Sequence, residues 1–310
     1  MRRTISPFSK LTVPEWIENS IKAGTLESLR VAIQIDPANA RLIAHFGMAL
    51  ANLAVAEETD PAEARRMRAE ADFQTGRALK LAPDNDEVKA AIQNNLGNAL
   101  YGQGIRTRGA EASELLTQAV AAYRSALEVF SNADLPRSRA ATQNNLASAL
   151  WTLGDQSEGE EGLKPKRESI ELLRQVVSYQ LDDLSRYRLA STLGSLAFDL
   201  VLNSQFAEAQ TRCEEAQRLA NEIGDGVQKS DRDNLIFIQG NLAHALLFQG
   251  HYDEALAIYR QYWDKPLNGK TFGEVTLEDF ATFDKAGLTH PDLSRMKRAL
   301  EDLPSKAPSP

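Results

Sequence analysis

The sequence predicts an all-α protein, built as a solenoid of antiparallel helix pairs, and three observations support this prediction. The 310-residue chain repeats itself, because QNNLGNALYGQG at 93–104 returns fifty residues later as QNNLASALWTLG at 143–154. The stretches between the scattered glycines and prolines are rich in Ala, Leu, Arg, Glu and Gln, which favour helices. Small and large residues also alternate at fixed positions, as closely packed helix pairs require. A fixed internal period indicates a repeat architecture.

The helix pairs are expected in a fixed order along the chain. PEWIENSIKA (14–23) predicts a capping helix, with Pro14 at a first-turn position where its missing N–H costs nothing. TLESLRVAIQIDPANA (25–40) is half a copy of the repeat. The fuller copies lie at 45–53 with 69–85, at 93–104 with 118–127, at 143–154 with 168–177, at 191–220 and at 238–260.

Two further helices are expected to cap the C-terminal end of the solenoid. One is TLEDFATFDKAG (276–287), in which Thr276 and Asp279 resemble a capping pair, and the other is HPDLSRMKRALEDL (290–303). The last residues, PSKAPSP, predict a disordered tail. The expected boundaries are 1–303 for a single repeat domain, about 14–24 and 276–303 for its helical caps, and 304–310 for the tail.

Each copy carries a pair of leucines and a series of small residues. The leucines are four apart on the first helix, which places them on one face, toward the partner helix. These pairs are Leu96 and Leu100, Leu146 and Leu150, Leu196 and Leu200, and Leu242 and Leu246. The small residue after the first large one is Gly47, Gly97, Ala147, Ala197 or Ala243. The second helix of each copy also has a small residue, which is Ala71, Ala119, Ser169, Ala209 or Ala255. A further small or apolar residue follows seven positions later, at Ala78, Ala126, Val176 or Ala216. We expect the helices to cross at these residues.

The spacing between the two helices of a copy varies in an orderly way. The small residues of the two helices are twelve apart in the last two copies and twenty-two apart in the middle two. We therefore expect ten inserted residues at the inter-helix turns, at IRTRGAEASE (105–114) and DQSEGEEGLK (155–164). The first full copy has a similar insertion at 55–70. Pro37 and Pro83 are expected to end the second helix in the first two copies.

These motifs resemble the tetratricopeptide repeat (TPR) family. GHYDEALAIY (250–259) follows its pattern most closely, and RALKLAP (77–83) and LRVAIQIDP (29–37) match its end. In SQFAEAQTRCEEA (204–216), Ser204 replaces a glycine and Cys213 an aromatic residue. The resemblance covers about residues 15–265 and implies a right-handed solenoid of five to six repeats. The longer, NNL-bearing copies are similar to repeats of large bacterial TPR proteins and of the kinesin light chain.

Composition and charge narrow the function classes. Apolar residues make up 43% and charged residues 25%, as in soluble folded proteins, and no run of eighteen apolar residues predicts a membrane span. The net charge of −8 argues against a nucleic-acid partner. The start, MRRTISPFSKL, lacks the apolar run of a secretory signal. Since the lone Cys213 cannot form an internal disulfide, the cytoplasm is the expected compartment.

The sequence offers no constellation for catalysis. HExxH, GxxxxGK[ST] and GxGxxG are all absent, and the sequence shows no recognisable nucleophile–base pair. The four histidines do not converge at metal-ligand spacing. Cys213 takes the place of a packed aromatic and is expected to be a buried thiol. We therefore expect a protein that is not an enzyme, with no metal and no cofactor.

The asparagines beside the leucines are the candidate binding residues. An Asn amide offers donors and an acceptor in one plane, so it can bond both polar groups of an extended peptide backbone. In the groove that the TPR resemblance implies, the row is similar to the asparagine ladders of kinesin-light-chain repeats. The fourth copy interrupts it with Gly194, Ser195 and Phe198. The candidate peptide-binding residues are Asn94, Asn95, Asn98, Tyr101, Asn144, Asn145, Trp151, Asn241 and His244.

Two interpretations remain open for this row. In the first, the protein is an interaction scaffold, and the amides face a groove that binds an extended segment of a partner protein. In the second, the asparagines bond neighbouring helices and lock one repeat to the next, and the chain self-associates or packs against other domains of a larger bacterial signalling assembly. The direction of the amides distinguishes a free ladder from an inter-helix lock.

Overall fold

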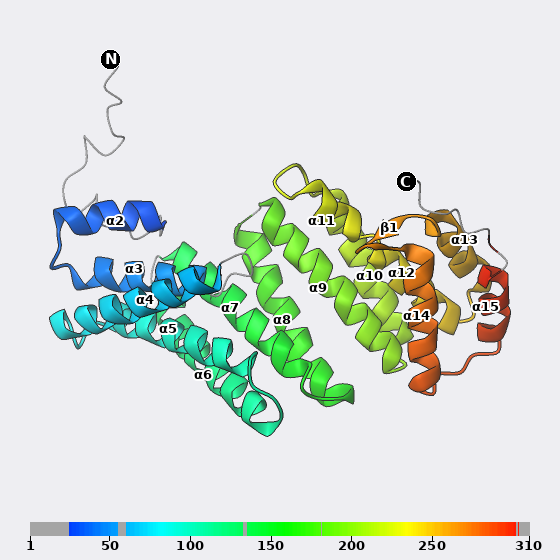
Figure 1. Cartoon of the computed structure of the whole chain (residues 1–310), viewed down its shortest axis with the longest axis horizontal. Coiled ribbons are helices and arrows are strands. Elements are labelled where there is room, and N and C mark those ends of the chain that lie inside the picture. Colours follow the sequence, from blue (N-terminus) through cyan, green and yellow to red (C-terminus); the bar gives the residue numbers. More distant parts are fainter. Residues whose placement is uncertain (1–24, 55–59, 133–134, 181, 302, 304–310) are drawn as a thin grey trace, which may run out of the picture. The chain divides into compact units, whose positions relative to one another are not determined.

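A computed structural model describes residues 25–54, 60–132, 135–180, 182–301 and 303 of the chain (Figure 1). The expected capping helix at 14–23 and the expected tail at 304–310 lie outside these residues. Contacts group the chain into two compact units, residues 1–156 and 157–310. The single domain at 1–303 stays a prediction. Almost all of the described secondary structure is helical, which confirms the predicted all-α class.

Helices that are neighbours in sequence also pack as neighbours in unit 1. α3 packs against α4 and α5, α5 packs against α6, and α6 packs against α7, while α2 packs against α3. These contacts make an array of antiparallel pairs, as the repeat predicts. The described residues of unit 1 form the helices α2 (Leu26–Ile35), α3 (Ala40–Leu53), α4 (Pro61–Leu81), α5 (Asp86–Gly104), α6 (Ala110–Asn132) and α7 (Pro136–Gly154).

Unit 2 is also built of packed helices and contains a short β-hairpin before its last two described helices. α9 packs against α8, α10 and α12, and α12 packs against α10 and α13. A two-stranded antiparallel hairpin of β1 (Pro266–Leu267) and β2 (Lys270–Thr271) then leads into α14. The helices of unit 2 are α8 (Gly159–Tyr179), α9 (Asp183–Leu202), α10 (Phe206–Asn221), α11 (Lys229–Asn234), α12 (Phe237–Phe248), α13 (Tyr252–Tyr262), α14 (Phe272–Lys285) and α15 (Leu293–Glu301).

The small residues mark the helix crossings, as predicted. A Cβ on Gly47 would stand 2.8 Å from the Thr75 hydroxyl and 3.1 Å from the Ala71 carbonyl oxygen, so α3 and α4 meet there with no room for a larger side chain. The remaining members of the series are buried, namely Ala147, Ala197, Ala243, Ala119, Ser169, Ala209, Ala255, Ala78, Ala126, Val176 and Ala216. The predicted alternation is therefore confirmed across both units.

The leucine pairs follow the prediction in α7 and α9 but not in α5. Leu146, Leu150, Leu196 and Leu200 are buried. Leu242 of α12 is half-buried, beside a buried Leu246. In α5, by contrast, Leu96 is 46% exposed and Leu100 is half-buried, so the prediction of a buried pair is wrong there. The physical reason is that Leu96 lies about 200° around the helix from Asn94, the residue through which α5 bonds α3 and α7, so its face points away from both helices.

The inserted residues lengthen helices more than they lengthen turns. The turn between α5 and α6 spans only residues 105–109, and the rest of the insertion at 105–114 belongs to α6. As a result α4, α6 and α8 run for 21, 23 and 21 residues, against 16 for α10 and 11 for α13. α2 and α4 both end two residues before a proline, at Pro37 and Pro83, as predicted.

The start of α14 corrects the expected capping pair. The helix begins at Phe272, and its capping box joins Thr271 to Glu274: each residue's side chain accepts the backbone N–H of the other. The expected pair has other partners. The buried hydroxyl of Thr276 donates to the Phe272 carbonyl, and Asp279 bonds His244. The helix therefore starts four residues earlier than the sequence predicts.

Candidate functional site

Four asparagines from three helices of unit 1 meet at one oxygen atom. Asn52 lies in the last turn of α3, Asn94 and Asn98 lie one turn apart on α5, and Asn145 lies on α7. The side-chain Nδ2 atoms of Asn94, Asn98 and Asn145 stand 3.0, 2.9 and 3.0 Å from Asn52 Oδ1. We call these four residues the amide centre.

A second layer of polar groups orients the amide centre. The Tyr123 hydroxyl donates to Asn98 Oδ1 at 2.8 Å. The single proton of the Thr142 hydroxyl is shared between Asn94 Oδ1 at 3.1 Å and the Ser138 carbonyl oxygen at 2.8 Å. Burial raises the pKa of Tyr123, so its phenol keeps the proton that it donates. Asn145 Nδ2 also reaches Asn94 Oδ1 at 3.3 Å. With their oxygens engaged in this way, Asn94 and Asn98 present their N–H groups to Asn52.

Burial explains why these amides pair with each other. Asn94 is fully buried and Asn98 is 3% exposed, and buried polar groups are costly unless they are hydrogen-bonded. Asn95, also buried, donates to the Thr75 hydroxyl at 2.8 Å, while its Oδ1 has no partner among the described residues. These amides therefore tie neighbouring helices, which is the arrangement expected of an inter-helix lock.

Three other candidate residues of unit 1 stand nearer the surface. Asn144 is half-buried, and its side chain makes no hydrogen bond to another described residue. Tyr101 is half-buried and lies with its hydroxyl 3.4 Å from that of Thr152 on α7. Trp151 is half-buried, and Ser148, one turn before it, is exposed. The sequence-predicted set therefore divides into buried amides and a more accessible group on α5 and α7.

Asn241 in unit 2 also bonds a neighbouring helix. It is buried, and its Nδ2 donates to the Gly194 carbonyl oxygen on α9 at 2.9 Å. A Cβ on Gly194 would lie 2.7 Å from Ile238 and 2.8 Å from Phe237, so glycine permits this close approach of α9 and α12. Gly194, which interrupts the asparagine row, thus accepts a hydrogen bond at its carbonyl oxygen from Asn241 of the next copy.

His244 is enclosed in a chain of hydrogen bonds. Its Nδ1 lies 2.7 Å from the Tyr259 hydroxyl and its Nε2 lies 3.0 Å from Asp279 Oδ2. Burial, with the Asp279 charge, raises the pKa of Tyr259, so the phenol donates to Nδ1 and the Nε2–H donates to the carboxylate. Phe280 and Phe283 of α14 pack edge-on against the imidazole. His244 therefore fastens α14 to the α12–α13 pair.

A serine, a histidine and a glutamate also align in unit 1, in an arrangement that the sequence did not reveal. His45 Nδ1 lies 3.4 Å from the Ser138 hydroxyl, and Nε2 lies 3.6 Å from Glu87 Oε2. Burial would raise the pKa of Glu87, but His45 and the Arg41 guanidinium outweigh it and hold that pKa below its usual range. Ser138 is 3% and His45 1% exposed. A nucleophile needs access to its substrate, so this alignment serves packing.

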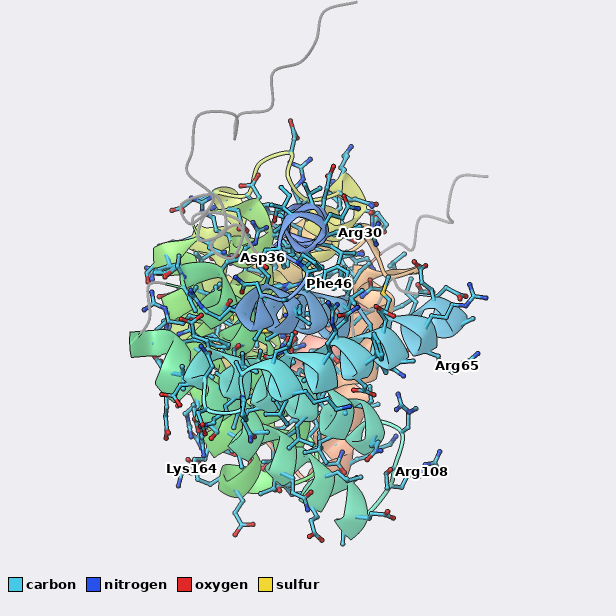
Figure 2. The ribbon with its side chains drawn as sticks, turned by 90° about the vertical axis from the view of Figure 1, so that its left-hand side faces the viewer. Arg30, Asp36, Phe46, Arg65, Arg108 and Lys164 are labelled. Carbon is cyan, nitrogen blue, oxygen red and sulfur yellow. The ribbon has the colours of Figure 1, made fainter. Side chains whose placement is uncertain are left out.

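The remaining polar chemistry is limited. Within the described residues, no three His, Cys, Asp or Glu side chains gather as a metal site would require. Cys213 is buried as predicted, and burial raises the pKa of its thiol. A cavity of about 630 Å³ lies among α2, α3 and α4, with Arg30 and Arg66 beside Asp60, Glu63 and Glu70 in its wall. Figure 2 labels Arg30 beside the ribbon of α2, which is seen end-on.

The fold and these contacts define a class, that of all-α proteins built from repeated antiparallel helix pairs. No protein-family model matches the chain, and no curated protein matches it either. Among solved structures, the crystal structure of BtubC (BKLC) from P. vanneervenii is similar over 97% of this chain and 98% of that chain. The two are 15% identical in sequence, with a TM-score of 0.46. No described helix is both long enough and apolar enough to cross a bilayer.

Proposed function

We propose that the protein is a non-enzymatic scaffold that binds an extended segment of a partner protein along α5 and α7 of unit 1. The observation that carries the proposal is the half-buried amide of Asn144, which has no hydrogen-bond partner among the described residues. Asn is a poor helix former. An Asn in the middle of a helix whose side-chain amide makes no hydrogen bond therefore does not stabilise the fold, and its presence needs another explanation. A bound peptide backbone supplies that reason, because the amide can bond its N–H and C=O groups.

The neighbours of Asn144 suit an extended chain. α5 and α7 touch at Asn94–Asn145 and again at Tyr101–Thr152. Ser148 is exposed and lies one turn after Asn144 on the same face of α7. The half-buried rings of Tyr101 and Trp151 add apolar area for side chains of the ligand. In this proposal the buried asparagines shape the surface, and Asn144, Tyr101 and Trp151 contact the ligand.

A second candidate function is self-association or docking within a larger bacterial signalling assembly. The observation that favours it is an apolar pair on α2, where Val31 and Ile35 are 43% and 56% exposed one turn apart. Helix faces of this kind pack against other helices when a partner is present. Under this alternative, the cytoplasmic protein uses the outer face of α2 and leaves α5 and α7 unoccupied.

Peptide display on the whole chain tests the proposal. Peptides selected on the wild type are measured against Asn144→Ala and Ser148→Asp by fluorescence polarisation. We expect each substitution to weaken binding about tenfold, the effect of losing roughly 1.4 kcal/mol at a contact. Val31→Asp is the matched control, because it places the same side chain at an exposed position on another helix. Equal affinities for all three variants would contradict the proposal, and loss of a dimer only in Val31→Asp would favour the second candidate.

A further inference from the structure

The amide centre holds more donors than its acceptor needs. Asn52 Oδ1 faces the Nδ2 atoms of Asn94, Asn98 and Asn145, all within 3.0 Å. A carbonyl oxygen has two lone pairs, so three N–H groups exceed what one amide oxygen accommodates. A carboxylate has two oxygens and about four acceptor sites. The donor set is therefore suited to an oxygen acceptor at least as strong as the one that occupies it.

Asn52 holds this position by its oxygen alone. Its Nδ2 makes no hydrogen bond to another described residue, and the residue is half-buried in the last turn of α3. Asn94 and Asn98 lie buried beneath it, whereas Asn145, like Asn52, is half-buried. Asn52 thus covers buried donors from the solvent side, and rotation of its side chain would uncover them.

We propose that the amide centre is a binding site for an oxygen acceptor, and that Asn52 is its built-in occupant. A carboxylate or carbonyl oxygen of a bound segment takes the place of Asn52 Oδ1 when Asn52 turns toward solvent. The inference rests on the proposed function only for the source of that oxygen. The centre itself is defined by Asn94, Asn98 and Asn145, which the second layer of Thr142 and Tyr123 keeps oriented.

The test removes the occupant and supplies a substitute in solution. Asn52→Ala in the full chain leaves three donors around an empty space, and thermal unfolding is measured with sodium formate, with formamide and with sodium chloride. We expect formate to raise the Tm by about 2 °C or more at a large excess over its Kd, because a ligand of the native state stabilises it. A response to formate identifies a carboxylate acceptor, and a response to formamide alone identifies a carbonyl.

Asn241→Ala is the matched control for this experiment. The same atoms are removed, but the space it leaves faces an acceptor, the Gly194 carbonyl, in place of three donors. We expect no response of this variant to formate beyond that to chloride. If Asn52→Ala and Asn241→Ala respond equally, or if Asn52→Ala responds to neither formate nor formamide, Asn52 only fastens helices and the proposal is wrong.

A second variant keeps the test decisive if Asn52→Ala does not fold. Asn52→Asp places a carboxylate among the three donors, which lower its pKa and stabilise the folded chain above the unfolded value of about 3.9. We expect Asn52→Asp to match or exceed the wild-type Tm at pH 7 and to lose this advantage as the pH falls through the folded pKa. A Tm below that of the wild type at pH 7 would contradict the proposal.

The two proposals fail in different ways. If formate or formamide rescues Asn52→Ala while no displayed peptide depends on Asn144 or Ser148, the acceptor site stands and the proposed peptide surface does not. If the peptides depend on those residues but neither small molecule rescues the variant, the surface stands without the acceptor site.

Discussion

Gly97 on α5 and Tyr123 on α6 fit together with no space between them. A Cβ on Gly97 would stand 2.5 Å from Cε1 of the Tyr123 ring, closer than real Cβ contacts allow. The ring is fully buried, and its hydroxyl bonds Asn98, so it cannot move aside. The crossing of the two helices and the orientation of the amide centre therefore depend on the same tyrosine.

Replacement of this glycine should be costly. Gly97→Ala is expected to lower the free energy of unfolding by about 1–3 kcal/mol, because a methyl group is forced into a packed crossing. Urea denaturation measures the change. Gly76 on α4 is the control, because nothing lies within 4 Å of its added Cβ. Gly76→Ala should raise the free energy of unfolding by about 0.5–1 kcal/mol, because Ala favours a helix more than Gly does. Equal effects of the two substitutions would show that Gly97 is not tightly packed against Tyr123.

The bond from His244 to Asp279 should contribute to stability more than a surface ion pair does. Asp279→Ala leaves the buried Nε2–H without an acceptor, at an expected cost of about 1–3 kcal/mol. Asp284, like Asp279, lies on α14, and its exposed carboxylate pairs with Lys297 of α15. Asp284→Ala should lower the free energy of unfolding by less than about 1 kcal/mol. Chemical denaturation of both variants measures the difference. A cost for Asp279→Ala as small as that for Asp284→Ala would show that α14 does not depend on His244.

A regular ladder of ion pairs between α8 and α10 should make stability depend on pH. Arg167 bonds Glu208, and Arg174 bonds Glu215 seven residues further along both helices. The bond from Arg167 lowers the pKa of Glu208. For Glu215, Arg174 outweighs the effect of burial and again lowers the pKa. Since both pKa values are depressed in the folded chain, this stabilisation is present above the unfolded pKa and is lost as the pH falls.

The measurement compares the wild type with Glu208→Gln/Glu215→Gln from pH 7 to pH 3. We expect a difference of about 1 kcal/mol at pH 7 for the two partly exposed pairs together, reduced by added salt. The difference should vanish once both carboxylates are protonated in the folded state. Glu301→Gln, at an exposed site on α15, is the control and should show no such trend. A constant difference across this pH range would contradict the ladder.

Cys213 should be inert until its unit unfolds. The thiol is buried on α10, and burial raises its pKa, so the reactive thiolate is scarce in the native state. Labelling with a disulfide reagent should proceed at the rate of unfolding and become fast in urea. Ser148→Cys/Cys213→Ala carries an exposed thiol in place of the buried one and should be labelled quickly in the native state. Fast labelling of the wild type without denaturant would contradict a buried thiol.

The fold could be predicted because its rules repeat along the sequence. A crossing such as that of Gly47 with Ala71 is required in every helix pair, so small residues recur at a readable spacing. Leu96 departs from the rule, because its exposure depends on whether another helix covers its face of α5, and the spacing within one copy does not show this. The start of α14 carried a readable signal, since TFGE at 271–274 has the pattern of a capping box.

The amide centre was only partly predictable. The asparagines near each leucine stand out by repetition, and three of them belong to the centre. Asn52 does not stand out, because its partners lie 42, 46 and 93 residues away and no other copy has an asparagine at its position. The contact of all four side chains depends on how three helices converge in space. Position in a motif therefore identified candidates, but not their partners.

The bond between Asn52 and Asn145 has a consequence for how unit 1 opens. Arrays of helix pairs hold together through adjacent neighbours, so their ends can fray one pair at a time. Here a side chain of the first pair bonds a helix 93 residues later, beyond the pair between them. Opening of α3 would also release α5 and α7, which favours all-or-none unfolding over stepwise fraying. Backbone amides of α3, α5 and α7 should consequently exchange their hydrogens with a single shared opening free energy.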